Sequence, residues 1–166
     1  MKLLDNLTTV LEEEIENLDR LLLLCAKQKE TLVKNDVRSL NQENREEEEV
    51  LSKLKKSELV RVEITNEICQ ALNLGGEGPT LSELLPHLEE PYRAKLRQMG
   101  DKLHQSLKEI QSVNRTNALL LANSLSLIQK KVELLTQIGE GNDILYSEEG
   151  RINLNGIKRR IIDSKA

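Results

Sequence analysis

A repeat of apolar residues at seven-residue intervals is the feature that most constrains the fold of this chain. Near the start it falls on Leu4, Leu11, Leu18, Cys25 and Leu32, with more leucines beside it. Because an α-helix completes two turns in about seven residues, this spacing places the repeat along one face of one helix. The pattern predicts a long amphipathic helix that ends near residue 34.

A second helix is predicted up to about residue 72. Asn35 and Asp36 precede it, and either side chain can accept a backbone N–H at a helix start. Its apolar positions are Val37, Leu40, Leu51, Leu54, Ile64, Ile68 and Leu72. Glycines and a proline crowd residues 73–79, where continued helix would be costly, so the helix ends there. This stretch is interpreted as a turn and not as a phosphate-binding loop, because no strand precedes it and no Gly-Lys-Ser/Thr comes after it.

Thr80 and Glu83 form the capping-box pattern that opens a helix. Pro86 and Pro91 interrupt the next turns, because a proline lacks the N–H and collides with the preceding turn. These residues predict a short helix near 80–89 and a long helix from about residue 91.

The long helix carries a coiled-coil seam in which apolar positions recur at steps of three and four residues. The seam comprises Leu96, Met99, Leu103, Ser106, Ile110, Val113, Asn117, Leu120, Ser124, Leu127, Lys131, Leu134 and Ile138. A second row widens the apolar face at Leu107, Leu121, Ile128 and Leu135. A helix with two apolar flanks is expected to have two neighbours.

These patterns predict an all-α fold, an elongated antiparallel bundle of about three long helices with spectrin-like connectivity. The second helix and the long helix are expected to be antiparallel neighbours. The bundle domain is expected over residues 1–139, with a mobile C-terminal tail over 140–166. Ile157, Ile161 and Ile162 fall on one side of a helix, so the tail is either a short amphipathic helix or a frayed end.

Composition and charge exclude several classes of protein. The 24 basic and 28 acidic residues nearly balance, which is typical of a solvated helix surface and not of a nucleic-acid-binding face. Apolar runs fall far short of the roughly 20 residues that span a bilayer, and acids interrupt the N-terminus where a signal peptide needs an apolar core. We therefore expect a cytoplasmic protein without membrane insertion.

The residues that usually perform catalysis or hold metals do not form a pattern here. His87 and His104 are far apart and lack a cysteine or carboxylate at metal-ligand spacing. Cys25 and Cys69 lack the paired spacing of a zinc or redox motif and are expected to be small buried residues. We expect no enzyme activity, no cofactor and no metal site.

Two asparagines stand out within the long helix. Asn117 occupies a seam position where an apolar residue would be more stabilising, and Asn114 lies one turn before it. A buried amide costs free energy unless it finds hydrogen-bond partners. Asn117 therefore either sets the register of the bundle or contacts a partner protein, and the first interpretation is favoured.

This stretch resembles the FlgN-like family of flagellar export chaperones. The similarity lies in an Asn-x-x-Asn-x-Leu-Leu pattern and the spaced apolar residues after it, here Asn114, Asn117, Leu119, Leu120, Leu125 and Ile128. The segment 32–40 is similar to the family's junction between its first two helices, and 47–54 to its second helix. Tyr146 with Gly150, and the closing residues 162–166, resemble the family's tail.

The resemblance implies a cytoplasmic chaperone that holds hook-associated proteins, prevents their premature assembly and delivers them to the flagellar export machinery. An elongated bundle with a mobile tail could clasp a partner's C-terminal helical segment. The residues expected to bind the partner are Asn114, Asn117, Leu127, Leu134, Ile138, Tyr146, Ile157, Ile161 and Ile162. The alternative is a coiled-coil scaffold or tether that self-associates. Whether the chain forms a homodimer stays open, because a wide apolar face serves either kind of packing.

Overall fold

The structure, a computed structural model, describes residues 2–74 and 80–143, and their side chains up to residue 136. It divides into two compact units, residues 1–121 and 122–166, and each is described by itself. The predicted binding residues Tyr146, Ile157, Ile161 and Ile162, the side chain of Ile138 and the predicted tail from residue 144 onward lie outside the described part.

The described residues are helical apart from short connections, which confirms the all-α prediction. In order, the elements are α1 (Lys2–Lys34), α2 (Val37–Ala71), the one-turn α3 (Leu81–Leu84), a 3₁₀ turn (Leu85–His87) and α4 (Tyr92–Asp143). The short helix predicted over 80–89 is thus wrong in part: one α-helical turn is followed by a 3₁₀ turn, since Pro86 lacks the N–H that an α-helix needs there. Helix α4 continues to Asp143, past Ile138, the last residue of the predicted seam, and into the segment from residue 140 that was predicted to be a mobile tail.

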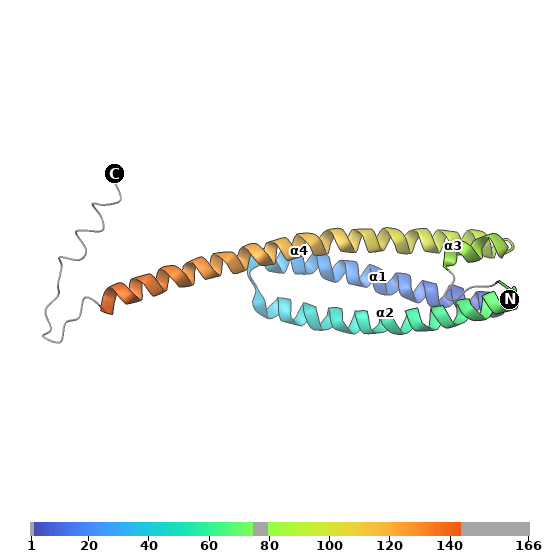
Figure 1. Cartoon of the computed structure of the whole chain (residues 1–166), viewed down its shortest axis with the longest axis horizontal. Coiled ribbons are helices and arrows are strands. Elements are labelled where there is room, and N and C mark those ends of the chain that lie inside the picture. The colour runs from blue at the N-terminus through green and yellow to red at the C-terminus, as the bar shows by residue number, and fades with distance from the viewer. Residues whose placement is uncertain (1, 75–79, 144–166) are drawn as a thin grey trace, which may run out of the picture. The chain divides into compact units, whose positions relative to one another are not determined.

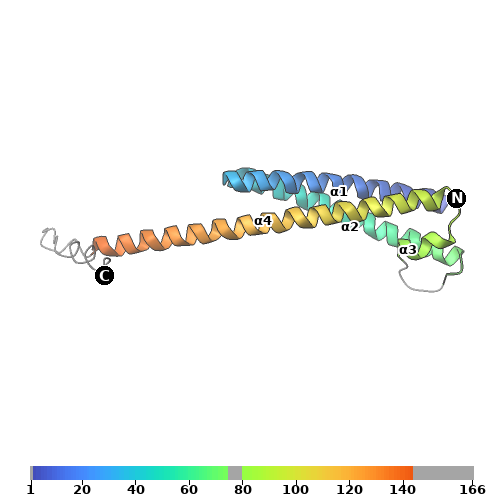
Figure 2. The ribbon, with the colours of Figure 1, turned by 90° about the horizontal axis from the view of Figure 1, so that it is seen from above.

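In the first unit, α1 and α2 pack side by side as an antiparallel pair, and the first part of α4 runs along them (Figure 1; Figure 2). Two ion pairs show that α4 is parallel to α1, since a later residue of α4 pairs with a later residue of α1. Lys95 Nζ lies 3.0 Å from Glu12 Oε1, and one heptad later Lys102 Nζ lies 3.0 Å from Asp19 Oδ2. Helices α2 and α4 are therefore antiparallel, and the bundle of three long helices is confirmed.

Asn35 and Asp36, in the turn between α1 and α2, have different roles. Asn35 has φ of 55°, the left-handed conformation that asparagine tolerates best after glycine. Its N–H and that of Asp36 donate to the carbonyls of Leu32 and Thr31, which closes α1. Asp36 is the N-cap of α2 and accepts from the Ser39 N–H at 3.1 Å. Of the two residues that could have capped α2, Asp36 does so and Asn35 does not.

Residues 80–88, which precede α4, pack at one end of the bundle, where Leu84 and Leu88 belong to its core. The capping box at Thr80 is present as predicted: the Glu83 N–H donates to the Thr80 hydroxyl, and a Glu83 carboxylate oxygen accepts the Thr80 N–H. Helix α3 lies close to α4 at Gly100, where a Cβ would stand 3.0 Å from Leu81 Cδ2. Glycine at this position lets the two helices approach.

Two apolar clusters form the core of the first unit. The cluster near the N-terminus joins every helix, and its buried members are Leu7, Leu11, Ile68, Cys69, Leu84, Leu88, Leu96 and Met99. The second cluster lies farther along α1, and its buried members are Leu18, Leu21, Leu24, Cys25, Val50 and Ile110. The predicted seven-residue repeat of α1 thus faces the core, and both cysteines are buried.

The predicted apolar face of α2 is wrong in part. Val37 is 66% exposed and Leu51 is 46% exposed, whereas Glu43 is buried. Farther along α2, Val50 and not Leu51 takes the buried position.

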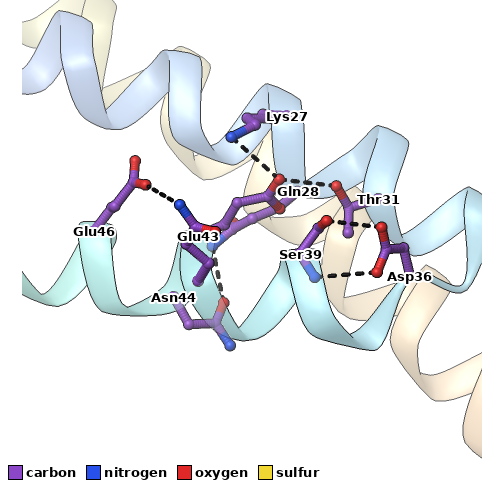
Figure 3. A network of polar contacts seen from close by, with 9 residues as sticks. Lys27, Gln28, Thr31, Asp36, Ser39, Glu43, Asn44 and Glu46 are labelled. Carbon is purple, nitrogen blue, oxygen red and sulfur yellow. Dashed lines mark hydrogen bonds and ion pairs between the residues drawn. The ribbon is translucent and has the colours of Figure 1, made fainter.

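Glu43 is buried in a polar interface near the α1–α2 turn, where polar side chains of the two helices meet (Figure 3). The Thr31 hydroxyl donates to Glu43 Oε1 at 2.9 Å, and the Lys27 ammonium lies 3.6 Å from the same oxygen. Hydrogen bonding compensates part of the cost of burying this carboxylate.

Candidate functional site

The second unit carries an apolar face on α4 that no described residue covers. Its large apolar side chains, together called the α4 stripe, are between 54% and 68% exposed: Leu125, Leu127, Ile128, Val132, Leu134 and Leu135. The same seam is buried in the first unit, at Leu96, Met99 and Ile110. A contiguous exposed apolar patch on a helix is typical of a surface that binds another protein.

The α4 stripe consists of two rows. Successive residues of an α-helix are turned by about 100°, so Leu127 and Leu134 lie on one side of Lys131 while Ile128 and Leu135 lie on the other. Leu125 and Val132 lie beside Ile128 and Leu135, farther from Lys131 around the helix, and so widen that row. Such a face is wide enough to contact more than one helix, or one helix and a second apolar segment.

The structure brings only some of the predicted binding residues together on this face. Leu127 and Leu134 belong to the α4 stripe, but Asn117 is buried in the first unit. The Asn117 Nδ2 donates to the carbonyl oxygen of Cys25 at 2.8 Å, which ties α4 to α1. Its Oδ1 is buried without a described hydrogen-bond partner. In this structure Asn117 therefore makes a contact inside the bundle. Asn114, one turn before it, is exposed, but its side chain also reaches α1, where it hydrogen-bonds the Cys25 thiol.

Four members of the α4 stripe were not among the predicted binding residues: Leu125, Ile128, Val132 and Leu135. A signal for them was present, because Leu125 and Val132, and Ile128 and Leu135, are each seven residues apart. The spacing shows that these residues share a helix face, but it does not show whether that face is covered.

A groove in the first unit is a second candidate surface. It encloses about 800 Å³. Its floor is α1 from Leu7 to Leu18, a length of about 16 Å at 1.5 Å per residue. Its walls are α2 and α4, with Leu51 and Leu107, each 46% exposed, among the lining residues. The groove has the length of about three helical turns.

An ion pair lies on the floor of this groove. Arg61 Nε is 3.0 Å from Glu14 Oε1 and 3.1 Å from Oε2. Burial raises the pKa of the Glu14 carboxyl, and the charge and hydrogen bonds of Arg61 lower it by less. The net shift is upward, so desolvation of Glu14 outweighs its attraction to Arg61.

The raised pKa of Glu14 gives a testable pH dependence. The folded protein binds the Glu14 proton more tightly than the unfolded chain does. The resulting contribution to the free energy of unfolding is therefore greatest below the pKa of Glu14 in the unfolded chain, and it is lost as pH rises through the pKa in the folded protein. We expect the wild type to gain free energy of unfolding relative to Glu14→Gln as pH falls from 7 towards 4. Urea unfolding at several pH values measures this, with Glu13→Gln on the same helix as the control. A difference that is constant with pH would contradict the prediction.

Catalytic and metal-binding groups do not converge in the described part of the chain. His87 and His104 are both exposed, and residues 2–74 and 80–143 contain no cluster of three metal-ligating side chains. Burial raises the pKa of the Cys25 and Cys69 thiols, which favours the unreactive protonated form. No helix within these residues is both long and apolar enough to cross a membrane.

Comparison with known proteins assigns the family. The family model described as FlgN protein matches residues 1–153, which includes the whole of the described structure. No curated protein and no solved structure matches the chain at a significant level. The match covers all the helices described above, so the chain belongs to the FlgN family, a family of flagellar export chaperones.

Proposed function

We propose that this protein binds hook-associated proteins in the cytoplasm, prevents their premature assembly and delivers them to the flagellar export machinery. The family membership supports a chaperone role in flagellar export. The exposed α4 stripe is the observation that supports a protein as the binding partner. A helical segment of the partner would pack its apolar face against this stripe, which would hide from other subunits the surface needed for assembly.

The size of the α4 stripe sets how tightly it alone could bind. Burying the exposed half of each of its six side chains contributes about 1 kcal/mol per residue, or about 6 kcal/mol in all. Association costs about 4–15 kcal/mol in lost freedom of the partners. The stripe alone would therefore bind weakly, and more contacts are needed.

The additional contacts are proposed to come from the residues after α4. The full set of proposed contact residues is Asn114, Asn117, Leu127, Leu134, Ile138, Tyr146, Ile157, Ile161 and Ile162, with the other members of the α4 stripe added to it. Asn117 could reach a partner only if its hydrogen bond to Cys25 opened, so it is the least favoured of these residues.

Isothermal titration calorimetry tests the proposal. The full-length chain is titrated with the C-terminal segment of a hook-associated protein, and saturable binding below tens of micromolar is expected. No binding heat at several temperatures, at tens of micromolar protein, would overturn the proposal. Light scattering of the chain alone tests the scaffold alternative, because a scaffold would grow in mass with concentration, whereas a chaperone would keep one discrete mass.

A further inference from the structure

Lys131 lies in the middle of the α4 stripe. Viewed down the helix axis, Leu127 and Leu134 lie about 40–60° to one side of Lys131, and Ile128 and Leu135 lie about 40–60° to its other side. A helix that packs across both rows must therefore cover the apolar stem of Lys131, and it brings its own residues within reach of the Lys131 ammonium. Lys131 is exposed and forms no ion pair with any residue in the described part of the chain.

Covering this ammonium has a large energetic consequence. A charge that loses its water without gaining a partner costs several kcal/mol, more than any single leucine contact on the stripe returns. A carboxylate placed opposite Lys131 would offset that cost through a charge-assisted hydrogen bond. The charge pattern around Lys131 favours an acidic occupant as well. Lys130 is next to it in sequence, and Glu133 is turned by about 160° to the opposite side of the helix.

We propose that the α4 stripe recognises an amphipathic helix that carries an aspartate or glutamate within its apolar face, in register with Lys131. The proposal rests on the proposed function, and it adds the chemistry by which the exported segment is selected. Leucine contacts supply attraction without distinguishing one amphipathic helix from another, whereas a covered ammonium rejects helices that lack the carboxylate. Lys131 is thereby a specificity-determining residue.

Two other occupants fit this charge pattern less well. A second copy of the chain cannot supply the carboxylate from the same stretch, because Glu133 is on the side away from the stripe, and parallel pairing in register would bring two Lys131 side chains together. The chain's own closing segment, residues 157–166, has four basic residues, Lys158, Arg159, Arg160 and Lys165, against one acid, Asp163, so its net charge has the wrong sign. An acidic helix of the exported protein satisfies both the apolar rows and the ammonium between them.

Charge variants of Lys131 in the full-length chain test this inference. The probe is a synthetic peptide of the hook-associated protein's C-terminal segment, and its Kd is measured at several salt concentrations. We expect Lys131→Glu to weaken binding by about 10- to 100-fold, since a close ion pair would become a repulsion. Lys131→Met keeps the apolar stem without the charge, and it should bind more weakly than the wild type and with a smaller dependence on salt. Lys108→Glu, an exposed lysine of α4 in the first unit, is the matched control and should change the Kd by less than about twofold.

A peptide variant locates the partner carboxylate. Each acidic residue of the peptide is replaced by lysine in turn, and one of these peptides should bind Lys131→Glu better than the original peptide does. The inference is overturned if Lys131→Glu and Lys131→Met bind with the wild-type Kd and salt dependence, or if no peptide variant restores binding. Failure of the proposed function gives a different result, because the wild-type chain itself would then not bind the peptide.

Discussion

Replacing Leu96 by alanine is expected to lower the free energy of unfolding by about 2–5 kcal/mol. Leu96 is fully buried in the cluster that joins α4 to α1, α2 and α3. Removing its branched end forfeits the burial of three carbon atoms and leaves a cavity that the surrounding helices fill only in part. Urea denaturation monitored by circular dichroism measures the loss.

Leu119→Ala is the matched control for this prediction. Leu119 also lies on α4 in the first unit, but it is 62% exposed. Because alanine is a good helix former and little burial is lost, this variant should stay within about 0.5 kcal/mol of the wild type. Equal losses for the two variants would mean that α4 does not pack on the first cluster as described.

The double variant Leu127→Glu/Leu134→Glu is expected to weaken binding of the hook-associated segment by about 100-fold or more. Each change replaces an apolar contact of the α4 stripe by a carboxylate that docking would strip of water, and a loss of about 1.4 kcal/mol per site already gives this factor. Both residues are more than half exposed in the free chain, so the free energy of unfolding should hardly change. Calorimetry gives the Kd, and thermal unfolding checks the fold.

Two other double variants make this test specific to the stripe. Leu23→Glu/Leu59→Glu makes the same chemical change at positions of α1 and α2 that are 72% and 65% exposed, and it should bind normally. Leu51→Glu/Leu107→Glu introduces the same two carboxylates in the groove of the first unit. If the groove variant lost binding and the stripe variant kept it, the binding site would have to be moved to the groove.

The long helices and where they begin were predictable because they depend on neighbours in sequence. The spacing of apolar residues along α1 reports one face of a helix, and the capping box at Thr80 is formed by residues three apart. The role of Asn35 was not predictable in the same way. An asparagine can either cap a helix or adopt a left-handed conformation, and the geometry of the turn between α1 and α2 selects the second.

The candidate site was predictable in two of the six stripe residues, Leu127 and Leu134, and its exposure was not predictable. Leu127 and Leu134 follow from the seam, but the same spacing also predicted a buried Leu51, which is exposed, and gave no sign of the buried Glu43. Burial of Glu43 depends on Thr31 and Lys27 of the facing helix, so it is a property of the pair of helices. Periodicity identifies which residues share a face, and only a packed neighbour determines whether that face is covered.

The sequence by itself determined that this chain is all-α, where its long helices begin and which residues line the apolar faces of α1 and α4. These properties follow from interactions within a few residues along the chain. Only the tertiary structure decided that the α4 seam is buried at Leu96 and Ile110 but exposed at Leu127 and Leu134. The physical reason is length: helices of 33 and 35 residues cannot flank a helix of 52 residues along all of its turns. One continuous seam can therefore stabilise the bundle in one part and bind a partner in the other.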